Sequence, residues 1–454
     1  MPFIQTIRLS GSALASLESL SYTIAPKPGA SARPIHITYT AVALKGRGYV
    51  ASRNEISLPV FGLYAGYSNA VILILNYSDG SNETRLFAIS TKSFADSSGI
   101  LISPVILRRR SGTDDLGFDY LAMKSRLGGP IIIDTDGEIR WVSSAISSSF
   151  VSNFIDGGFV VGNESSTDIT RLELDGTRTT LSSNPSTGYV NFHHNLDLGR
   201  DELLGEVNTP SDIESTIVEV NAVTGMGKAW DLAKIIADHM VINGDDATAF
   251  VRPGVDWFHS NAAAYNESDD SLIVSSRENF LIDLDYITGS IKWILGDPTK
   301  YWYRFPSLRD KALLLANTGT YPIGQHSVSV TKDGRILIFN NGNPSLNQPV
   351  GAPVGTNRSY STVSAYTIDP INKTATLVWE FDYGKSIYSA VCGSAYEASD
   401  GSVLVDYAYA DNGTHSRLVG LNSNHQVVFD FQYDTAGCNT SWNAVPIPLQ
   451  DLRF

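Results

Sequence analysis

The sequence has few cysteines, no excess of basic residues and no long apolar run. Its 454 residues include only Cys392 and Cys438, which form either one disulfide or two buried free thiols. The net charge is -14, and lysine and arginine are scattered rather than clustered, which argues against nucleic acid as a partner. No run of about 18 apolar residues occurs, so we expect a soluble chain without a membrane span.

The N-terminal residues say little about the cellular compartment. MPFIQTIRLS lacks the basic patch, the long apolar run and the cleavage site of a signal peptide, although a mature chain with an added Met would look the same. Asn-X-Ser/Thr sequons are roughly twice as frequent as composition predicts, which mildly favours secretion. They begin at Asn76, Asn82, Asn163, Asn266, Asn357, Asn372, Asn412 and Asn439.

The first hundred residues predict a small antiparallel β-sandwich. Apolar and polar residues alternate in IHITYTAVAL (35–44) and NAVILILNYS (69–78), and turns rich in Pro, Gly and Asn separate such runs. The polar run LRRRSGTDD (107–115) suits a linker or an exposed connection. Because 454 residues exceed one ordinary domain, we predict two, formed by residues 1–100 and 101–454.

A hairpin pattern recurs after residue 100. Each copy is an apolar strand that ends in Asp or Asn, a turn, and a second strand that usually ends in an aromatic residue. Six copies predict six similar hairpins. They are IIIDTDGEIRW (131–141), LELDGTRTTL (172–181), VEVNAVTGMGKAW (218–230), LIDLDYITGSIKW (281–293), YTIDPINKTATLVW (366–379) and LVGLNSNHQVVF (418–429).

A second hairpin precedes most of these copies, with an Asp or Gly turn and a run rich in β-branched residues. Two hairpins make a four-stranded unit, and such units repeated radially form a β-propeller whose first strands line the axial channel. We therefore predict an all-β protein, a six-bladed β-propeller with an N-terminal β-sandwich domain. The second runs are GGFVVG at Gly157, DELLGEV at Asp201, DSLIVSS at Asp270, GRILIFN at Gly334 and GSVLVDY at Gly401.

Three histidines share one position relative to these second hairpins. His194 and His326 each stand seven residues before the turn aspartate, and His259 stands eleven before it because four residues (266–269) are inserted. All three therefore lie on the innermost strand of a blade. Because the inner strands of consecutive blades converge on the axis, we expect these histidines to meet in one channel.

The remaining histidines have a simpler interpretation. A single histidine is usually a satisfied or surface residue, which is how we interpret His36, His239, His415 and His425. For the three that share a position, the rival function is a metal site, because three imidazoles can hold Zn²⁺ with an open position. No His-X-His or carboxylate-rich cluster accompanies them, which weakens this alternative without excluding it.

Long segments resemble the aryl-sulfate sulfotransferase family. DWFHSNAAAYNESDDSLIVSSRENFLIDLDYITGSIKWILGDP (256–298) looks like its signature, and GQHSVSVTKDGRILIFNNGN (324–343) resembles its nucleophile strand. NFHHNLDL (191–198) fits as well, and LPVFGLYAGYSNAVILIL (58–75) is similar to its leading β-sandwich. The resemblance implies a ping-pong transfer of a sulfuryl group from a phenolic sulfate ester to a phenolic acceptor.

The resemblance also assigns roles to residues of the predicted channel. It implies that His326 forms a sulfohistidine intermediate. One histidine of the pair at 193 and 194 would complete the pocket; the shared position favours His194, and His193 is kept as the alternative and as a substrate contact. The catalytic residues implied are His326, His259, Arg277, Asn261 and His194.

The chemistry of sulfuryl transfer requires side chains of the same types as those that the resemblance implies. The nucleophile has to be neutral and make a bond that breaks again, which suits the imidazole of His326. The sulfate oxygens stay anionic, so a guanidinium and neutral donors have to hold them, as Arg277 and Asn261 can. A second histidine, for which His259 is our first choice, protonates the departing phenolate and later takes the proton of the acceptor.

Some of these residues have simpler interpretations. Arg277 suits an exposed strand end, and Asn261 suits a turn or strand-edge amide. The tryptophans are mostly expected in the core. Only Trp257, next to the His259 strand, is a candidate for contact with an aromatic substrate.

Two other functions stay open. Water could discharge the intermediate, which would make the protein an aryl sulfate hydrolase, or the propeller could bind a ligand without catalysis. Neither G-x-x-x-x-G-K-[ST] nor G-x-G-x-x-G occurs, so we expect no nucleotide donor and no cofactor. The expected partners are small phenolic molecules, the expected location is secreted or periplasmic, and the oligomeric state, a homodimer included, is left open.

Overall fold

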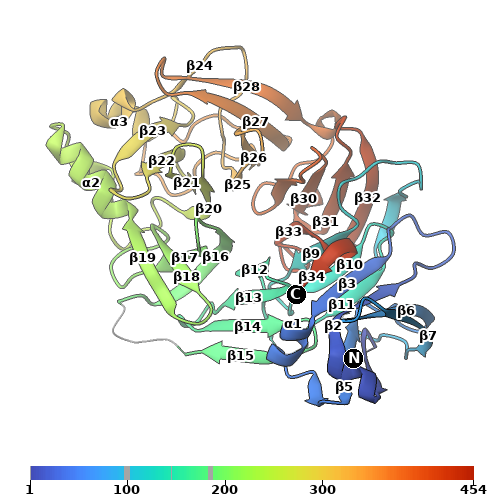
Figure 1. The fold of residues 1–454 in the computed structure, drawn as a ribbon. Coiled ribbons are helices and arrows are strands. Elements are labelled where there is room, and N and C mark those ends of the chain that lie inside the picture. Colours follow the sequence, from blue (N-terminus) through green and yellow to red (C-terminus); the bar gives the residue numbers. More distant parts are fainter. Residues whose placement is uncertain (1, 97–102, 145, 183–187) are drawn as a thin grey trace.

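A ring of β-sheets surrounds a central axis, and the N-terminal part lies at one side of the ring (Figure 1). The computed structural model describes residues 2–96, 103–144, 146–182 and 188–454. The predicted all-β propeller is confirmed. The predicted domain boundary near residue 100 falls in the segment 97–102, outside the described residues.

Six sheets of four or five strands form the ring. From the axis outward, the first three contain β33 (Asn443–Ile447), β9 (Tyr120–Lys124), β10 (Ile131–Asp134) and β11 (Ile139–Val142); β12 (Ser152–Ile155), β13 (Gly158–Gly162), β14 (Ile169–Glu173) and β15 (Arg178–Leu181); and β16 (Asn191–Leu198), β17 (Leu203–Asn208), β18 (Thr216–Asn221) and β19 (Gly225–Asp231). The last three contain β20 (Ser260–Asn266), β21 (Ser271–Ser276), β22 (Leu281–Asp285) and β23 (Ile291–Leu295); β25 (His326–Val330), β26 (Ile336–Asn340), β27 (Thr362–Asp369), β28 (Thr374–Phe381) and β24 (Leu314–Leu315); and β29 (Ser394–Glu397), β30 (Val403–Tyr409), β31 (His415–Leu421), β32 (Val427–Asp434) and β8 (Val105–Arg108).

The recurrent hairpin of the sequence forms the third and fourth strands of each sheet, counted from the axis. The first copy, residues 131–141, corresponds to β10 and β11, and the fourth, residues 281–293, corresponds to β22 and β23. The dense β-branched runs before the copies correspond to the second strands, such as β21 and β26. These second strands are buried along their whole length, which explains why their sequences are continuously apolar rather than alternating.

The ring is closed by strands from opposite ends of the propeller sequence. β33 pairs antiparallel with β9, from Asn443 opposite Lys124 to Ile447 opposite Tyr120, so the last blade strand in the chain becomes the inner strand of the first sheet. The first sheet therefore combines strands from the beginning and from the end of the propeller sequence. This pairing also fixes the six inner strands around one axis, with the starts of β20 and β25 facing the channel.

The N-terminal residues form two further sheets. One contains β1 (Ile4–Ser10), β5 (Glu55–Phe61) and β4 (Val50–Ser52), and the other contains β34 (Leu452–Arg453), β3 (Ile35–Thr40), β2 (Leu17–Ile24), β6 (Ser68–Tyr77) and β7 (Asn82–Ser90). β6 alternates buried and exposed residues, as its sequence predicts. The end of the chain returns to this part, because β34 pairs parallel with β3.

One local prediction was wrong, and another was wrong only in part, because residues 107–115 are mostly exposed as predicted. The strand predicted for residues 35–44 ends at Thr40, whose side chain accepts a hydrogen bond from the backbone of Ala43 and caps helix α1 (Ala41–Gly46). The linker predicted for residues 107–115 begins inside β8, which pairs with β32 at the outer edge of the sixth sheet. Its Arg110 is buried and donates 2.7 Å to Asp119, so part of this polar run is a packed connection.

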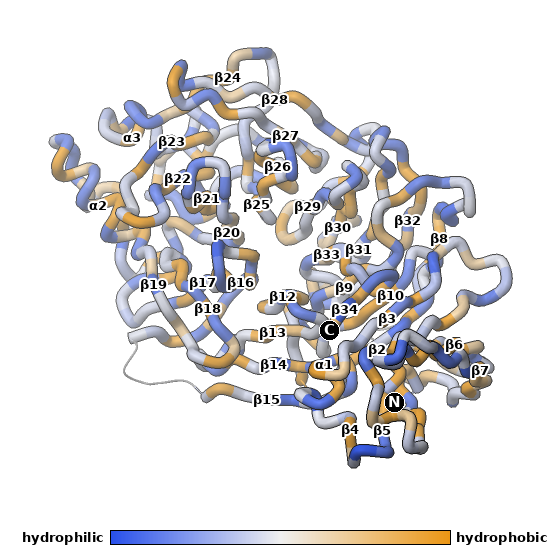
Figure 2. The backbone as a smooth tube through the Cα atoms, in the orientation of Figure 1, coloured by the Kyte–Doolittle hydropathy of each residue, from blue (hydrophilic) through white to orange (hydrophobic). Residues whose placement is uncertain are grey.

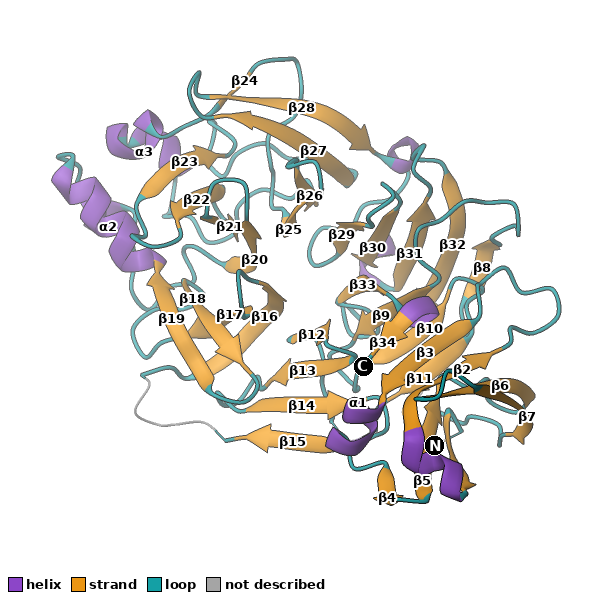
Figure 3. Cartoon of the chain, viewed as in Figure 1, coloured by secondary structure: helices purple, strands orange, loops and turns teal. Residues whose placement is uncertain are grey.

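The helices lie mostly outside the sheets. α2 (Leu232–Ile242) and α3 (Pro306–Asp310) lie on the outer side of the ring (Figure 3), and α4 (Ala410–Gly413) is a single turn after β30. Figure 2 shows hydrophobic and hydrophilic residues alternating along α2, whose Leu232, Ile236 and Met240 are buried. None of the helices in the described residues is long and apolar enough to cross a membrane.

A buried ion pair joins the N-terminal part to the first blade. Arg140, 1% exposed, donates 3.0 Å to the carboxylate of Asp134 and 2.7 Å to the carbonyl of Gly62. Burial raises the pKa of Asp134 to about 6, although Arg140 lowers it. The guanidinium also lies over the ring of Tyr64, 3.7 Å from its centroid. The N-terminal sheets are therefore held to the propeller by a charge that cannot reach water.

We expect Arg140→Met to lower the free energy of unfolding by about 3–5 kcal/mol, because it leaves Asp134 buried without its partner. Urea denaturation measures this change. The matched control is Arg453→Met, since Arg453 pairs with Asp451 in an exposed ion pair whose side chains are 75% and 55% accessible; it should leave the stability almost unchanged. Equal losses of unfolding free energy in the two variants would show that the buried ion pair stabilises the protein no more than the exposed one.

Candidate active site

The three histidines that share a sequence position meet at the channel. His194 lies on β16, His259 directly precedes β20, and His326 begins β25. The ring centroids of His194 and His259 are 4.6 Å apart, and those of His194 and His326 are 6.5 Å apart. One ring nitrogen from each histidine lies within 4.8 Å of those of the other two. The structure thus brings together three side chains that are distant in sequence.

Irregular backbone at the inner strands turns these side chains toward the channel. The backbone φ angles of His194 and His259 are positive, at 49° and 55°. Ser327, next to His326, also has a positive φ, of 51°. The strand register shifts at the same places in β16, β20 and β25. A bulge re-aims a side chain at the cost of local strain, which proteins tolerate mainly at functional sites.

These contacts show which histidine of the pair at positions 193 and 194 faces the other channel histidines. The ring of His194 faces His259 and His326, in agreement with the position argument. His193 lies opposite Glu206 in the strand register, and its Nδ1 is 3.0 Å from Nδ1 of His194. Burial lowers the pKa of both rings. His193 therefore contacts the ring of His194 and helps to fix its orientation.

His326 is held in one tautomer. Asn341 donates from Nδ2 to the carbonyls of Ser389 (2.7 Å) and Cys392 (2.8 Å), so its Oδ1 is the atom that faces Nδ1 of His326, 2.8 Å away. An amide oxygen only accepts, so Nδ1 carries the proton and Nε2 keeps its lone pair. The backbone N–H of Cys392 donates a hydrogen bond of 3.3 Å to that lone pair, which agrees with this tautomer. Burial, and then the charge of Arg277, lower the pKa of His326 to about 3, which keeps the ring neutral.

His259 has the opposite electrostatic environment. Its Nδ1 lies 2.6 Å from Asp256 and 2.8 Å from Glu214. Burial disfavours the charged ring, but the two carboxylates outweigh burial and raise the pKa of His259 to about 10. The same contacts hold the pKa of Glu214 well below its usual range, although burial acts against this. His259 is therefore an imidazolium at neutral pH, beside the neutral ring of His326.

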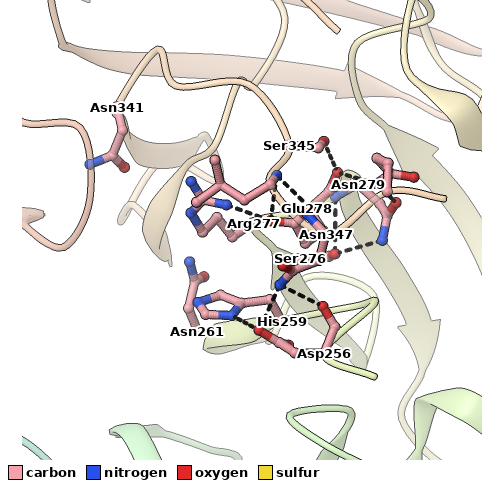
Figure 4. A network of polar contacts seen from close by, with 12 residues as sticks. Asp256, His259, Asn261, Ser276, Arg277, Glu278, Asn279, Asn341, Ser345 and Asn347 are labelled. Carbon is pink, nitrogen blue, oxygen red and sulfur yellow. Dashed lines mark hydrogen bonds and ion pairs between the residues drawn. The ribbon is translucent and has the colours of Figure 1, made fainter. Parts of the chain in front are cut away.

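Arg277 and Asn261 point toward the same space as His259 (Figure 4). Arg277 follows β21 and is 2% exposed; its Nη1 is paired with Glu278, while its Nη2 has no hydrogen-bond partner among the described residues. Asn261 donates 2.8 Å to the carbonyl of Gln325, and its buried Oδ1 is likewise unpartnered within that part of the chain. A buried N–H of a guanidinium without a partner is suited to an anionic oxygen.

A hydrogen-bond network connects the two charged sides of the site. Asn347 donates 3.1 Å to the carboxylate of Asp256, and its backbone N–H donates 2.8 Å to Glu278 (Figure 4). Glu278 in turn pairs with Arg277. Because each carboxylate is held by a neighbour, the positions of His259 and Arg277 are fixed relative to each other.

Sequence reasoning missed several residues of the site. Asp256 and Asn341 both lie in segments that resemble the family, so the resemblance could have found them. Glu214 lies outside those segments and carried no comparable signal. The ring of Trp442 lies 5.5 Å from that of His194, centroid to centroid. The substrate contact predicted for Trp257 is not supported, because its indole is 1% exposed and packs against Phe250 in the core.

The two cysteines form a disulfide, Cys392–Cys438, which decides between the two alternatives left open by the sequence. It lies directly beside the site, since the backbone of Cys392 contacts both His326 and Asn341. Trp442 follows Cys438 by four residues. The disulfide therefore anchors the segment that borders the nucleophilic side of His326.

Fold and site together define a β-propeller enzyme with a cluster of buried histidines in its channel. The family model described as arylsulfotransferase (ASST) matches residues 79–443. The chain belongs to the arylsulfotransferase family, which confirms the resemblance found in its sequence, and it is a sulfotransferase.

Individual relatives agree with this family. The arylsulfate sulfotransferase AssT of Escherichia coli O6:H1 is 24% identical over 74% of this chain and 72% of its own length. A protein of the same name from Lelliottia amnigena is 27% identical over 30% of this chain and 25% of its own. Among solved structures, the β-propeller domain of Cps50 (Swd1) from Myceliophteria thermophila is 13% identical, with a TM-score of 0.39 over 73% of this chain and 89% of that one.

We expect Glu214→Gln to lower the pKa of His259 by about 1–3 units, because it removes one of the two carboxylates that favour the charged ring. NMR titration of isotope-labelled histidine should show His259 losing its proton near pH 10 in the unmodified protein. The control is Glu219→Gln, since Glu219 bonds to Tyr286 and should not shift the titration. A His259 that titrates near the ordinary value of 6.5 would refute the assignment.

Proposed function

We propose that this protein transfers a sulfuryl group from a phenolic sulfate to a phenolic acceptor through a sulfohistidine at Nε2 of His326. The observation that carries the proposal is the hydrogen bond of Nδ1 to Asn341, 2.8 Å long, which leaves the lone pair on Nε2 of a neutral ring. A neutral imidazole is a good nucleophile and also leaves readily. The two half-reactions are those of a ping-pong mechanism.

In the first half-reaction Nε2 of His326 attacks sulfur, the N–S bond forms, and the S–O bond to the aryl group breaks. The departing aryloxide takes the proton of His259. The pKa of about 10 for His259 lies close to that of a phenol, about 10, so this proton transfer is nearly balanced in free energy. The free phenol then leaves.

The second half-reaction reverses these changes with a new phenol. The acceptor oxygen attacks sulfur while its proton moves to His259, and the N–S bond breaks to return the lone pair to Nε2. Because the carboxylates raise the pKa of His259 into the range of phenols, the same residue can serve as acid and as base. The carboxylates of Asp256 and Glu214 hold its ring in place throughout.

The sulfate oxygens need partners that are fixed in place before the reaction. The free Nη2 of Arg277 donates a hydrogen bond to them in a buried environment, where such bonds are stronger than in water. Asn261 contributes the second N–H of Nδ2, since the first donates to the carbonyl of Gln325. His194 stands between His259 and His326 and completes the wall of the pocket. The aromatic ring of Trp442 offers a contact for the aryl group.

Two neighbouring functions have to be separated from this one. A hydrolase would discharge the sulfohistidine with water, so product release would not depend on a phenolic acceptor. A propeller that only binds its ligand would release no phenol from p-nitrophenyl sulfate. His259 could serve as acid and base for water as well as for a phenol, so the support for the transferase comes from the match to the arylsulfotransferase family.

We propose that the protein works outside the reducing cytoplasm, secreted or periplasmic, without a cofactor. The Cys392–Cys438 disulfide supports this location, because such bonds persist in oxidising compartments. The division into residues 1–100 and 101–454 is likewise a proposal. The two N-terminal sheets support it, although β34 adds the end of the chain to one of them.

We predict a sulfuryl adduct on the peptide that contains His326 after the enzyme is quenched with donor alone. Mass spectrometry measures the adduct, and release of one phenol per enzyme should accompany it. His326→Ala should abolish both half-reactions. The control His259→Ala should keep some activity with donors whose phenolate needs no proton. An adduct on the peptide of His194 or His259 would show that the nucleophile is a different residue.

We also predict that Asn341→Leu lowers kcat by at least about tenfold, or about 1.4 kcal/mol, because the proton is then free to move from Nδ1 to Nε2 of His326. NMR of labelled histidine should show a mixture of the two tautomers. Asn341→Asp keeps an acceptor for Nδ1 and should keep the single tautomer, but it loses the hydrogen bonds to the carbonyls of Ser389 and Cys392 and should not restore full activity. Lost activity with an unchanged tautomer in Asn341→Leu would indicate that Asn341 has only a structural role.

A further inference from the structure

All three channel histidines use the same ring nitrogen to bind the protein. Nδ1 of His326 bonds to Asn341 at 2.8 Å, and Nδ1 of His259 bonds to Asp256 at 2.6 Å. Nδ1 of His194 lies 3.0 Å from His193. Nε2 of His194 and His259 is therefore left for a ligand, whereas Nε2 of His326 accepts a long hydrogen bond of 3.3 Å from the backbone N–H of Cys392, which a ligand would have to displace.

This pattern is the one that proteins use around a three-histidine metal ion. Histidine ligands almost always donate their second nitrogen to a carboxylate, an amide or a neighbouring group, which fixes the ring and raises its basicity. Three imidazoles around one open position suit Zn²⁺. Here one ring nitrogen each of His194, His259 and His326 lies within 4.8 Å of the other two. The sequence showed no carboxylate-rich cluster beside these histidines, but the fold brings Asp256 and Glu214 to His259.

The carboxylates beside His259 favour a dication, and they offset the opposing charge of Arg277 on the side of His326. Glu214 lies 2.8 Å from Nδ1 of His259 and 3.7 Å from Nδ1 of His194, and Asp256 adds a second carboxylate at His259. Imidazole ligands select transition-metal ions over Mg²⁺ and Ca²⁺, which prefer oxygen. The ion would form bonds to nitrogen without any redox change, and it would displace the proton that His259 carries.

We infer that His194, His259 and His326 form a binding site for Zn²⁺ or a similar transition-metal dication. The ion occupies Nε2 of His326, so it excludes the aryl sulfate and inhibits transfer reversibly. The inhibition rests on the proposed function, whereas the binding does not. Binding and inhibition are therefore measured separately.

Titration calorimetry of the whole protein with Zn²⁺ alone should give one strong site, and Mg²⁺ should give none. The site should be lost in His194→Ala and in His326→Gln, two variants chosen so that misfolding of one does not decide the result. The control His239→Ala should bind as the unmodified protein does, because His239 lies on α2 and contacts Ser307. Asp256→Asn should weaken binding about tenfold through His259.

In the activity assay, Zn²⁺ should raise KM for p-nitrophenyl sulfate without changing kcat, and a chelator should restore the rate. Absence of a strong Zn²⁺ site, or a site unaffected by both histidine variants, would overturn the inference whether or not the protein is a transferase. Strong binding with unaltered turnover would overturn the claim that the ion and the sulfate share one site. Failure of the proposed function would instead appear as no phenol release without any metal.

Discussion

The closure of the ring by β33 and β9 is the constraint on which the site depends. The pairing of Asn443 to Ile447 with Tyr120 to Lys124 joins the two ends of the propeller sequence, so that the inner strands surround one axis. Once closed, the ring places the starts of β16, β20 and β25 next to one another, and the bulges there aim three imidazoles at the same space. Long-range strand pairing thus replaces a local motif as the source of the catalytic geometry.

Two imidazoles in one buried cluster are driven to opposite charge states by their neighbours. An amide oxygen and a guanidinium surround His326, whereas two carboxylates surround His259, so the pKa of the first falls to about 3 and that of the second rises to about 10. Burial lowers both, and the difference comes from the partners. A neutral nucleophile and a charged acid can therefore stand side by side at the same pH.

Much of this arrangement could be predicted from the sequence. The repeated hairpins indicated the sheets of the propeller, and the position of His194, His259 and His326 before a turn aspartate indicated that they would meet. The partners of these rings could not be found in the same way. Asn341 follows β26, and Glu214 lies in the connection between β17 and β18, so only the folded sheets bring them to the histidines.

The misassigned segments have local physical causes. Residues 41–46 alternate like a strand, but the Thr40 cap makes a helix possible. Trp257 stands next to a catalytic strand in sequence, yet its side chain points into the core. A period of two or a short sequence distance does not determine where a side chain points when a cap or a bulge changes the backbone.

The stereochemical course at sulfur tests the sulfohistidine mechanism most directly. With a phenyl sulfate made chiral at sulfur by three oxygen isotopes, each in-line displacement inverts the configuration. Transfer through Nε2 of His326 takes two displacements and should give a product with retained configuration. An inverted product would mean that the acceptor attacks the donor directly, and that His326 never carries the sulfuryl group.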